Sequence, residues 1–582
     1  MSTRRQRAAL LAFAAAAGTM PLIARAQGAP LKSTPPKIQP ARCAGEYVAS
    51  ITVLTLPPLS HPPQNWWETP VSRMTSTHPA TQPEVISALL VLQPGDKCTE
   101  FQLEESERVL RAQPFVADAH IVVIPDTSGT VALVVHTEDE FSLIVGAKFS
   151  GASPYVTSLT LGDGNLGGSG NSVAANWTHT VDREGFGVAF TSYAFLDKPW
   201  QLQLLAARGQ VGVASYAGDL SHPFFTDAQR SAWRGSLADV TLLAPFQRAS
   251  DSAFNVAWHR EYFFAGSARR VGHPGLVALF GLALSSEYDA TALPASGYDS
   301  TVQYDSLLAR YAARRSARIN GIAQFRALSY GRGFRMGTVN GVQDLRRGVE
   351  VDALVGRGLG GFDDWVPDIF GTTTVFVGMG GGRSYGFLQS MVEARRATGS
   401  TTWTDAIASV RLRWYRRFTA YNTFTADFDF GGGWNTTRPF ELDLGQPDGG
   451  VRGYGASHDA GGERAALKLE DRVFLSSLFS TFDLAAAAFV DAGKVWAGDV
   501  PFGTTTPVKI GVGVGLLAAT PAGSRRTFRV DLAVPVSADT YARWEVRFTV
   551  INIAELGALQ EPIDIRFARE LVSTSSSFVY PR

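Results

Sequence analysis

The sequence has little charge and no long apolar run. Charged residues make up 18% of its 582 positions, and 53 basic side chains balance 53 acidic ones. A nucleic-acid-binding protein normally carries a basic excess, so this balance argues against that class. After the first 26 residues, no uninterrupted apolar stretch reaches about 18 residues, and helical membrane spans are therefore not expected in the rest of the chain.

Cysteine is scarce as well, since the chain contains only Cys43 and Cys98. An even number is compatible with one structural disulfide if the chain is exported to an oxidising compartment. The alternative is two separate buried thiols, because a sequence does not supply the distance that a disulfide requires. No HExxH motif and no cluster of Cys and His indicates a metal site, and no cofactor is expected.

Two short motifs that are typical of enzymes occur without their usual context. Residues 356–361 (GRGLGG) satisfy GxGxxG, but no βαβ pattern surrounds them. Ser457, His458 and Asp459 are neighbours in one expected loop, whereas the members of a catalytic triad meet in space from separate parts of a chain. We therefore expect no catalytic residue and no enzymatic activity.

The N-terminus has the pattern of an export signal. Three arginines within residues 4–7 form a basic start, residues 8–18 are apolar, and residues 24–26 (Ala-Arg-Ala) form a small-x-small cleavage site. The alternative is an anchoring helix, but the apolar stretch is shorter than the roughly 20 residues that a span needs. We expect a signal peptide at 1–26 and a proline-rich linker at 27–41.

Residues 42–140 have the pattern of one compact α/β unit. Apolar residues share one side of the second expected helix, with glutamates and arginines on the other side. Val131, Leu133 and Val135 share one face of the last expected strand. The expected elements are a strand at 47–54, helices at 83–92 and 101–112, and strands at 116–124 and 131–137.

From residue 141 to about residue 549 the pattern changes to short alternating segments, separated by turns rich in Gly, Asp, Ser and Pro. In the segment 423–430, Phe424 and Phe428 lie on one face of a strand while Asp427 and Asp429 lie on the other. The same alternation, with charged residues on the second face, recurs at 410–414, 528–534 and 544–548.

Two architectures fit this pattern. One is a soluble sandwich whose charged face meets solvent, and the other is a membrane barrel whose charged face lines an interior filled by water or a plug. About 400 residues of strands without a helical layer are many for one sandwich, and the apolar faces are rich in aromatics, as in the girdles of membrane barrels. Closure also pairs every backbone group, which hydrocarbon demands. We therefore predict an all-β transmembrane barrel at 141–549.

Two motifs in the second half of the chain resemble those of a known family. The segment 449–455 (GGVRGYG) precedes an expected strand at 465–475, and the segment 489–496 (FVDAGKVW) follows it. In these segments the sequence resembles the bacterial surface-antigen superfamily of outer-membrane assembly and two-partner-secretion transporters, whose barrels follow periplasmic POTRA (polypeptide-transport-associated) domains. The residues that match the family's loop motif are Val451, Arg452, Gly453 and Tyr454, and those that match its wall motif are Phe489, Asp491 and Gly493.

The resemblance implies a contact between Arg452, on a long loop folded into the barrel, and Asp491 on the inner wall. It also implies about 16 antiparallel strands. The contact makes physical sense, because an arginine carries a fixed fork of donors that one carboxylate accepts in two places. The alternative for Arg452 is a solvated loop charge.

The resemblance extends over most of the chain, with two departures. Residues 110–116 and the element order of 42–140 look like one POTRA domain, whereas the family's transporters usually carry two or more. Residues 511–515 and 528–535 look like the penultimate strands, yet family members commonly end on the residue that closes the last strand. The C-terminal residues 550–582 therefore contain either a later last strand, at 562–568, or a periplasmic tail.

The expected function is that of an outer-membrane barrel of a Gram-negative bacterium which translocates or inserts a client polypeptide. The POTRA-like domain would receive the client, and the loop at 451–454 would gate the lumen. The alternative is a passive outer-membrane channel or a structural surface antigen, although a diffusion pore has no use for a docking domain. The expected partners are outer-membrane lipid and a periplasmic client, and no nucleic acid. The sequence leaves open the client, the choice between protein and lipid as cargo, the direction of movement and the oligomeric state.

Overall fold

The structure is a computed structural model. It describes residues 43–58, 79–126, 129–149, 156–179, 184–209, 214–248, 251–293, 304–360, 365, 367–478, 481–537, 539, 543–558, 560–569 and 578–579. The expected signal peptide at 1–26 and the linker at 27–41 lie outside these residues.

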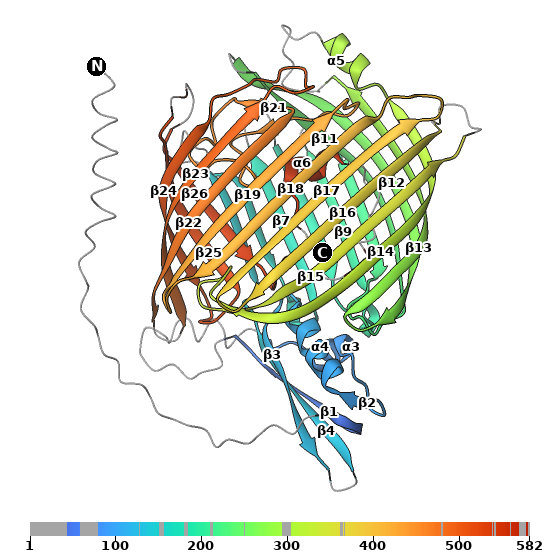
Figure 1. The fold of residues 1–582 in the computed structure, drawn as a ribbon, viewed down its shortest axis with the longest axis vertical. Coiled ribbons are helices and arrows are strands. Elements are labelled where there is room, and N and C mark those ends of the chain that lie inside the picture. Colours follow the sequence, from blue (N-terminus) through green and yellow to red (C-terminus); the bar gives the residue numbers. More distant parts are fainter. Residues whose placement is uncertain are drawn as a thin grey trace. The chain divides into compact units, whose positions relative to one another are not determined.

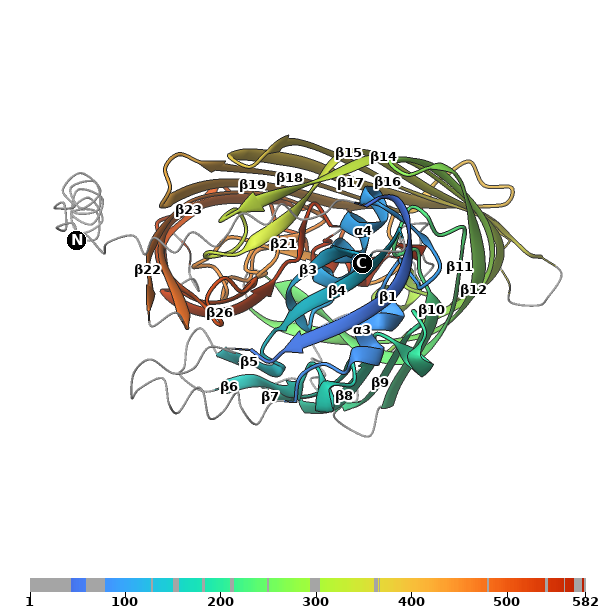
Figure 2. The same ribbon diagram turned by 90° about the horizontal axis from the view of Figure 1, so that it is seen from below.

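The small N-terminal unit is a four-stranded sheet with two helices (Figures 1 and 2). Its elements are β1 (Ala44–Leu56), α3 (Pro83–Leu89), β2 (Lys97–Thr99), α4 (Glu100–Arg111), β3 (Val116–Pro125) and β4 (Thr130–Asp139). The strand order is β2-β1-β4-β3, with β1 and β4 parallel and the other pairs antiparallel. The short strand β2 adds to the five elements that the sequence pattern indicates.

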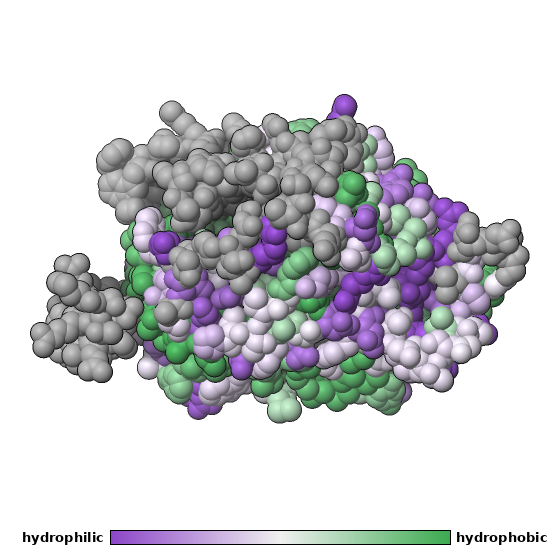
Figure 3. Space-filling model, turned by 90° about the horizontal axis from the view of Figure 1, so that it is seen from above, coloured by the Kyte–Doolittle hydropathy of each residue, from purple (hydrophilic) through white to green (hydrophobic). Residues whose placement is uncertain are grey.

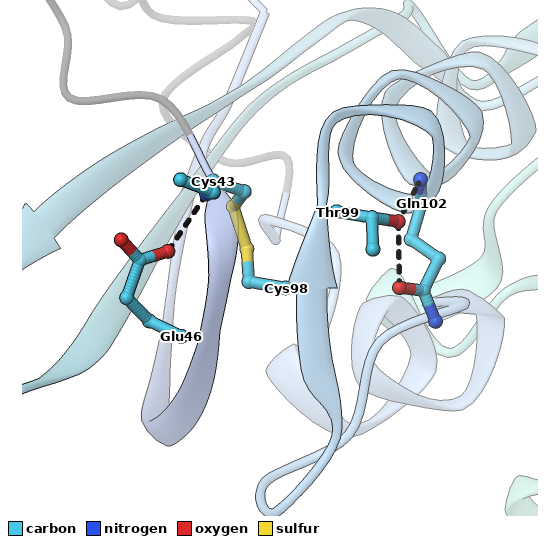
Figure 4. The surroundings of a disulfide bond; sticks show 6 residues. Cys43, Glu46, Cys98, Thr99 and Gln102 are labelled. Carbon is cyan, nitrogen blue, oxygen red and sulfur yellow. Dashed lines mark hydrogen bonds between the residues drawn. A yellow bond between two sulfur atoms is a disulfide. The ribbon is translucent and has the colours of Figure 1, made fainter.

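A disulfide between Cys43 and Cys98 joins the residue before β1 to β2 (Figure 4). The two Cα atoms are 5.1 Å apart, within the range that a disulfide spans. Thr99, the next residue, is the N-cap of α4, and its hydroxyl accepts a hydrogen bond from the backbone N–H of Gln102 at 3.3 Å. The bridge therefore fixes β1 beside the start of α4.

The rest of the described chain folds into a closed antiparallel barrel of 20 strands. Its first six strands are β5 (Leu143–Phe149), β6 (Val156–Asp163), β7 (Asn171–His179), β8 (Glu184–Ser192), β9 (Gln201–Gly209) and β10 (Ala214–His222). The next nine are β11 (Ser231–Arg248), β12 (Asp251–His273), β13 (Leu276–Ala292), β14 (Arg314–Phe334), β15 (Val342–Gly358), β16 (Asp368–Gly381), β17 (Ser384–Ala397), β18 (Thr404–Arg417) and β19 (Asn422–Trp434). The last five are β22 (Glu463–Leu478), β23 (Phe482–Trp496), β24 (Lys509–Ala519), β25 (Arg526–Pro535) and β26 (Glu545–Asn552).

The expectation of about 16 strands is wrong, because the barrel has four more. The number rested on resemblance and not on a count of segments. The first six strands are only seven to nine residues long. Their alternation is weak, since the neighbours Leu204 and Leu205 of β9 are 47% and 42% exposed although they point to opposite faces. Such strands are difficult to count from the sequence.

In the later strands the alternation separates an apolar exterior from a charged interior. In β25, Val530 and Leu532 are 46% and 45% exposed, whereas Arg529 and Asp531 are buried. Seen from above, hydrophobic residues gather along parts of the outer edge of the barrel and hydrophilic ones within it (Figure 3). The sandwich alternative is therefore wrong, because the charged face lies inside a closed barrel.

Helices are short outside the small unit. The described helix α5 (Tyr304–Arg310) lies between β13 and β14. No helix among the described residues is long and apolar enough to cross a membrane.

The structure of the C-terminal segment contradicts both alternatives that the sequence left open, a later last strand and a free tail. After β26 the chain forms β27 (Glu555–Leu556), which pairs in parallel with β15, and then the helix α6 (Ile563–Ala568). Residues 562–568 are therefore not a last strand. The segment is not a free tail either, because α6 packs with its buried Ile565 against Met391 and Ile407 on the inner wall of the barrel (Figure 1).

Candidate functional site in the barrel lumen

A long loop between β19 and β22 folds into the barrel. It contains the two-stranded hairpin of β20 (Leu442–Asp443) and β21 (Ala460–Gly461). Between the two strands of the hairpin, Val451 and Tyr454 are fully buried, and Arg452 is 7% exposed. The loop motif thus lies in the interior, and Arg452 is not a solvated surface charge.

Arg452 binds the wall residue Asp491 through three donors. Its Nε lies 2.7 Å from Asp491 Oδ2, its Nη2 lies 2.8 Å from Oδ1, and its backbone N–H donates to Oδ2 at 3.1 Å. The guanidinium also stacks on the ring of Phe489, 3.4 Å from the ring centroid. Phe489 and Asp491 share the inner face of β23 because they are two residues apart.

The same arginine belongs to a network in which three buried carboxylates face three guanidinium groups. Arg452 Nη1 lies 3.1 Å from Glu470 Oε2 and 3.3 Å from Asp531 Oδ2. Arg529 binds both of these acids, at 2.6 Å and 2.7 Å, and Arg472 binds Glu470 at 2.5 Å. The cluster is formally neutral, so removing one member leaves an uncompensated charge in a buried site.

Glycines on the wall make room for the loop. A Cβ atom on Gly511 would lie 2.0 Å from the carbonyl oxygen of Arg452, and a Cβ on Gly493 would lie 2.5 Å from Val451 Cγ2. A Cβ on Gly513 would lie 2.3 Å from the ring of Phe489. Gly511 of β24 and Gly493 of the wall motif therefore form the surface on which the loop rests, and Gly513 makes room for the ring that stacks on Arg452.

The residues after Arg452 fix the direction of the loop. Gly453 has a φ of +92°, a conformation that side chains rarely adopt, and its N–H donates to Glu545 Oε2 at 2.8 Å. The Tyr454 hydroxyl donates to the carbonyl of Ile510 at 3.0 Å. All four residues of the loop motif thus contact the wall formed by β23 to β26.

A second set of contacts joins the small unit to one end of the barrel. Arg111 of α4 binds Asp344 of β15, with nitrogen–oxygen distances of 3.2 Å and 3.3 Å. Arg525, before β25, donates to the carbonyls of Arg111 and Val116. Phe115 packs on Tyr193 of the β8–β9 turn, with the ring centroids 5.6 Å apart. The segment 110–116, which carries the resemblance to POTRA domains, therefore lies at this contact.

A buried carboxyl group also lies at this contact. Asp139 is fully buried at the end of β4, and both of its oxygens accept hydrogen bonds from Thr81, at 2.7 Å from the backbone N–H and 2.8 Å from the hydroxyl. The Thr81 hydroxyl in turn accepts from Asn165 of the barrel at 2.8 Å. Burial raises the pKa of Asp139 to about 6, against the lowering effect of the Thr81 hydrogen bonds.

Arg108 of α4 contacts the start of the C-terminal segment and the loop that binds the end of this segment. Its Nη2 donates to the carbonyl of Phe225 at 2.8 Å, and its Nη1 lies 3.5 Å from Glu555 Oε2. Phe224, the neighbour of Phe225, pairs with Val579 near the end of the described chain. One side chain of the small unit therefore contacts the start of the segment and the loop that holds its end.

The two short motifs that are typical of enzymes lie in a barrel strand and in the lumen loop. Gly356 and Gly358 belong to the barrel strand β15. The hydroxyl of Ser457 lies 3.0 Å from a carboxylate oxygen of Asp539 and 3.2 Å from one of Asp459. Within the described part of the chain, no three potential metal ligands lie together.

Sequence reasoning missed part of the site. Glu470, Arg529 and Asp531 complete the Arg452 network, and the alternation of β25 had already placed the last two on the charged face. The contacts of the C-terminal segment had no signal in the sequence.

The comparisons with known proteins yield remote structural matches. No family model and no curated protein matches the chain. Its structure is similar to that of BamA from Haemophilus ducreyi lacking POTRA domains 1–3, at 12% identity and a TM-score of 0.37, over 87% of this chain and 85% of that one. It is also similar to CdiB from Escherichia coli, at 10% identity and a TM-score of 0.40, over 87% of this chain and 76% of that one. The similarity to CdiB from Acinetobacter baumannii has 10% identity and a TM-score of 0.39, over 82% of this chain and 74% of that one. At such identities and TM-scores, no conclusion about function follows from the likeness.

Proposed function

We propose that this protein is an outer-membrane β-barrel which translocates or inserts a client polypeptide. In this proposal residues 43–140 form a POTRA-like periplasmic domain that receives the client. The observation that carries the proposal is the position of Arg108, which contacts both the barrel end and the segment inside the lumen. A diffusion pore has no need of a folded domain in contact with the contents of its lumen.

Placement in a membrane is supported by the exterior of the barrel. Large apolar side chains such as Leu282, Leu412 and Leu516 are 68%, 49% and 67% exposed on strands whose opposite faces are buried. An exposed apolar surface of this kind, on a closed barrel with paired backbone groups, is what a bilayer requires. Water would disfavour so many exposed apolar side chains.

The loop motif is proposed to act as a gate. Its arginine is bound by Asp491, Glu470 and Asp531 on three different strands, so the loop links β22, β23 and β25 across the wall. Movement of these strands relative to one another would break the network as a unit. A gate of this kind suits a lumen that opens for a client more than it suits a permanently open channel.

The test compares the proteins exported by the host with and without this gene. Quantitative proteomics of the outer membrane and the culture medium should show one or a few proteins depleted in the deletion strain. The wild-type gene should restore them, and a gene encoding Arg452→Ala should restore them less. Unchanged protein levels together with a lower uptake of small solutes would support the passive channel and reject the translocation proposal.

A further inference from the structure

The inner wall of the barrel holds the C-terminal segment mainly by its main chain. Side chains and N–H groups of the wall and of the β10–β11 loop lie within hydrogen-bond distance of nine carbonyl oxygens of the segment. The carbonyls belong to Ile553, Ala554, Leu556, Gly557, Ala558, Gln560, Phe567, Arg569 and Phe578.

The donors follow the segment in a row from β15, β17 and β18 to β12 and the loop at Phe224. Gln389 of β17 donates to two consecutive carbonyls, at 3.0 Å and 2.8 Å. The hydroxyl of Tyr385, on the same strand, lies 2.9 Å from the carbonyl of Leu556 and 2.5 Å from that of Arg346. Arg411 of β18 donates to the carbonyl of Gln560 at 3.0 Å. Across the lumen, Arg260 of β12 donates to the carbonyls of Phe567 and Arg569 at 2.9 Å and 2.8 Å.

Side chains of the segment add a few anchors. Arg569 binds Glu393 of β17 at 2.7 Å, and Asp564 binds Arg464 of β22 at 2.5 Å. Ile565 and Phe578 are fully buried, Phe578 beside Phe224 and Phe264. These anchors are specific to the sequence of the segment, whereas the hydrogen bonds to its carbonyls are not.

We propose that this row of donors is a peptide-binding track, which the chain's own C-terminal segment occupies until a client polypeptide takes its place. The track recognises the polypeptide main chain, because every residue of any sequence presents the same carbonyl acceptor. Such a surface can hold a client polypeptide without reading its side chains. The inference rests on the proposed function for the identity of the second occupant.

The position of Arg108 links the track to the small domain. Glu555, at the start of the segment, lies 3.5 Å from this arginine and 3.9 Å from Arg346 of the wall. A client that displaces α4 from the barrel would remove one cation from Glu555. The first residues of the segment would then be held less tightly when a client has arrived.

The test uses the full chain in detergent with the segment either locked or released. Phe224 and Val579 are paired across a parallel bridge, so their Cα atoms lie at about the 5 Å that a disulfide needs, and Phe224→Cys with Val579→Cys should lock the segment under oxidation. Leu345→Cys with Leu556→Cys provides a second lock at the other end. Arg569→Ala with Phe578→Ala should release the segment without changing the wall.

The probes are two fluorescent peptides, one with the sequence of residues 553–569 and one with the same composition in scrambled order. Anisotropy should show no binding to either locked protein and binding of both peptides to the released one. The apparent affinity of the released protein should exceed that of the wild type at least tenfold. In that background, Gln389→Leu should weaken both peptides about tenfold, because two hydrogen bonds are lost.

Matched variants control for changes in stability. Gln324→Leu removes another buried glutamine of the barrel, whose side chain donates to Asp352 and not to the segment. Arg566→Ala removes an exposed arginine of α6 and should not release the segment. Neither variant should change peptide binding, and wild type measured with and without reductant controls for the Cys43–Cys98 disulfide.

Three results would overturn the track. The first is failure of both cysteine pairs to form disulfides, and the second is absence of peptide binding to a folded released protein. The third is binding of the peptide with the native sequence alone, which would make the segment a dedicated structural plug. Peptide binding without any change in the exported proteins would reject the proposed function and keep the track. Altered export without peptide binding would reject the track and keep the proposed function.

Discussion

Arg452 satisfies three carboxylates at once, and this makes its replacement costly. Arg452→Ala leaves Asp491, which is fully buried, without its bidentate partner. We expect a loss of about 3–5 kcal/mol in the free energy of unfolding, the usual cost of breaking a buried pair. Arg452→Lys keeps the charge but loses the fork of donors, so the stability of this variant should lie between that of the wild type and that of the Arg452→Ala protein. Urea unfolding in detergent, followed by heat-modifiability on gels, measures the effect.

The control for this prediction is Arg357→Ala, which removes an exposed arginine from the barrel strand β15. Its effect should stay within about 0.5 kcal/mol, as for most surface substitutions. Equal stability of the Arg452→Ala and Arg357→Ala proteins would show that the network does not hold the loop.

Asp139 gives the small domain a dependence on pH. Its pKa of about 6 in the folded protein exceeds the ordinary value of 3.8, so the folded state binds the proton more tightly than the unfolded one. The contribution is therefore fully present below about pH 4 and is lost as the pH rises through 6, by at most about 3 kcal/mol. Hydrogen exchange in residues 79–89, corrected for the intrinsic rate, should show protection falling over this window.

Asp139→Asn should flatten that dependence, because an amide does not titrate. Protection that rises between pH 4 and pH 7 in the wild type, or that falls equally in the variant, would assign the effect to another group.

At the scale of elements, Gly511 of β24 decides whether the loop fits. Gly511→Ala would place a methyl group 2.0 Å from a backbone oxygen of the loop, and a backbone atom does not move away cheaply. We expect the loop to leave its seat although Arg452 itself is unchanged. Limited proteolysis of residues 444–459 should become faster, as in the Arg452→Ala protein.

Gly371→Ala serves as the matched control, since a Cβ on this barrel glycine meets no atom within 4 Å. If the Gly511→Ala protein is cleaved as slowly as the Gly371→Ala protein, the loop does not depend on contact with Gly511.

The elements also show which parts of the fold the sequence predicts. Strands such as β18, β19 and β25 alternate strongly, because one face is apolar and the other carries buried charges, and their positions follow from the sequence alone. The segment 563–567 alternates as well, with apolar residues at 563, 565 and 567, yet it forms the helix α6. A segment of six residues inside a lumen takes its conformation from the surrounding walls and not from its own period.

For the residues in the lumen, too, the sequence predicts some contacts and not others. The Arg452–Asp491 contact follows from two motifs that lie close to each other in the sequence. The contact between Arg260 and the carbonyls of residues 567 and 569 joins positions about 300 residues apart, and a carbonyl has no sequence signal. Pairing of this kind becomes visible only in three dimensions.

At the scale of the molecule, three parts meet at one end of the barrel: the small domain, the barrel turns and the start of the C-terminal segment. Arg111 and Asp344 join the first two, and Arg108 and Glu555 join the first and the third. The lumen contains the loop and the segment, both held by networks of charged residues. This organisation fits a gated conduit in which the domain controls what the lumen holds.

The most direct test of this account is the single-channel conductance of the purified protein in planar bilayers, with and without residues 43–140. The account predicts a low, flickering conductance for the full chain, because the loop and the C-terminal segment occupy the lumen. Removal of the domain should raise the open probability, because Arg108 no longer contacts Glu555 and the loop at Phe225. A large, steady conductance that does not depend on the domain would contradict the account and favour a passive pore.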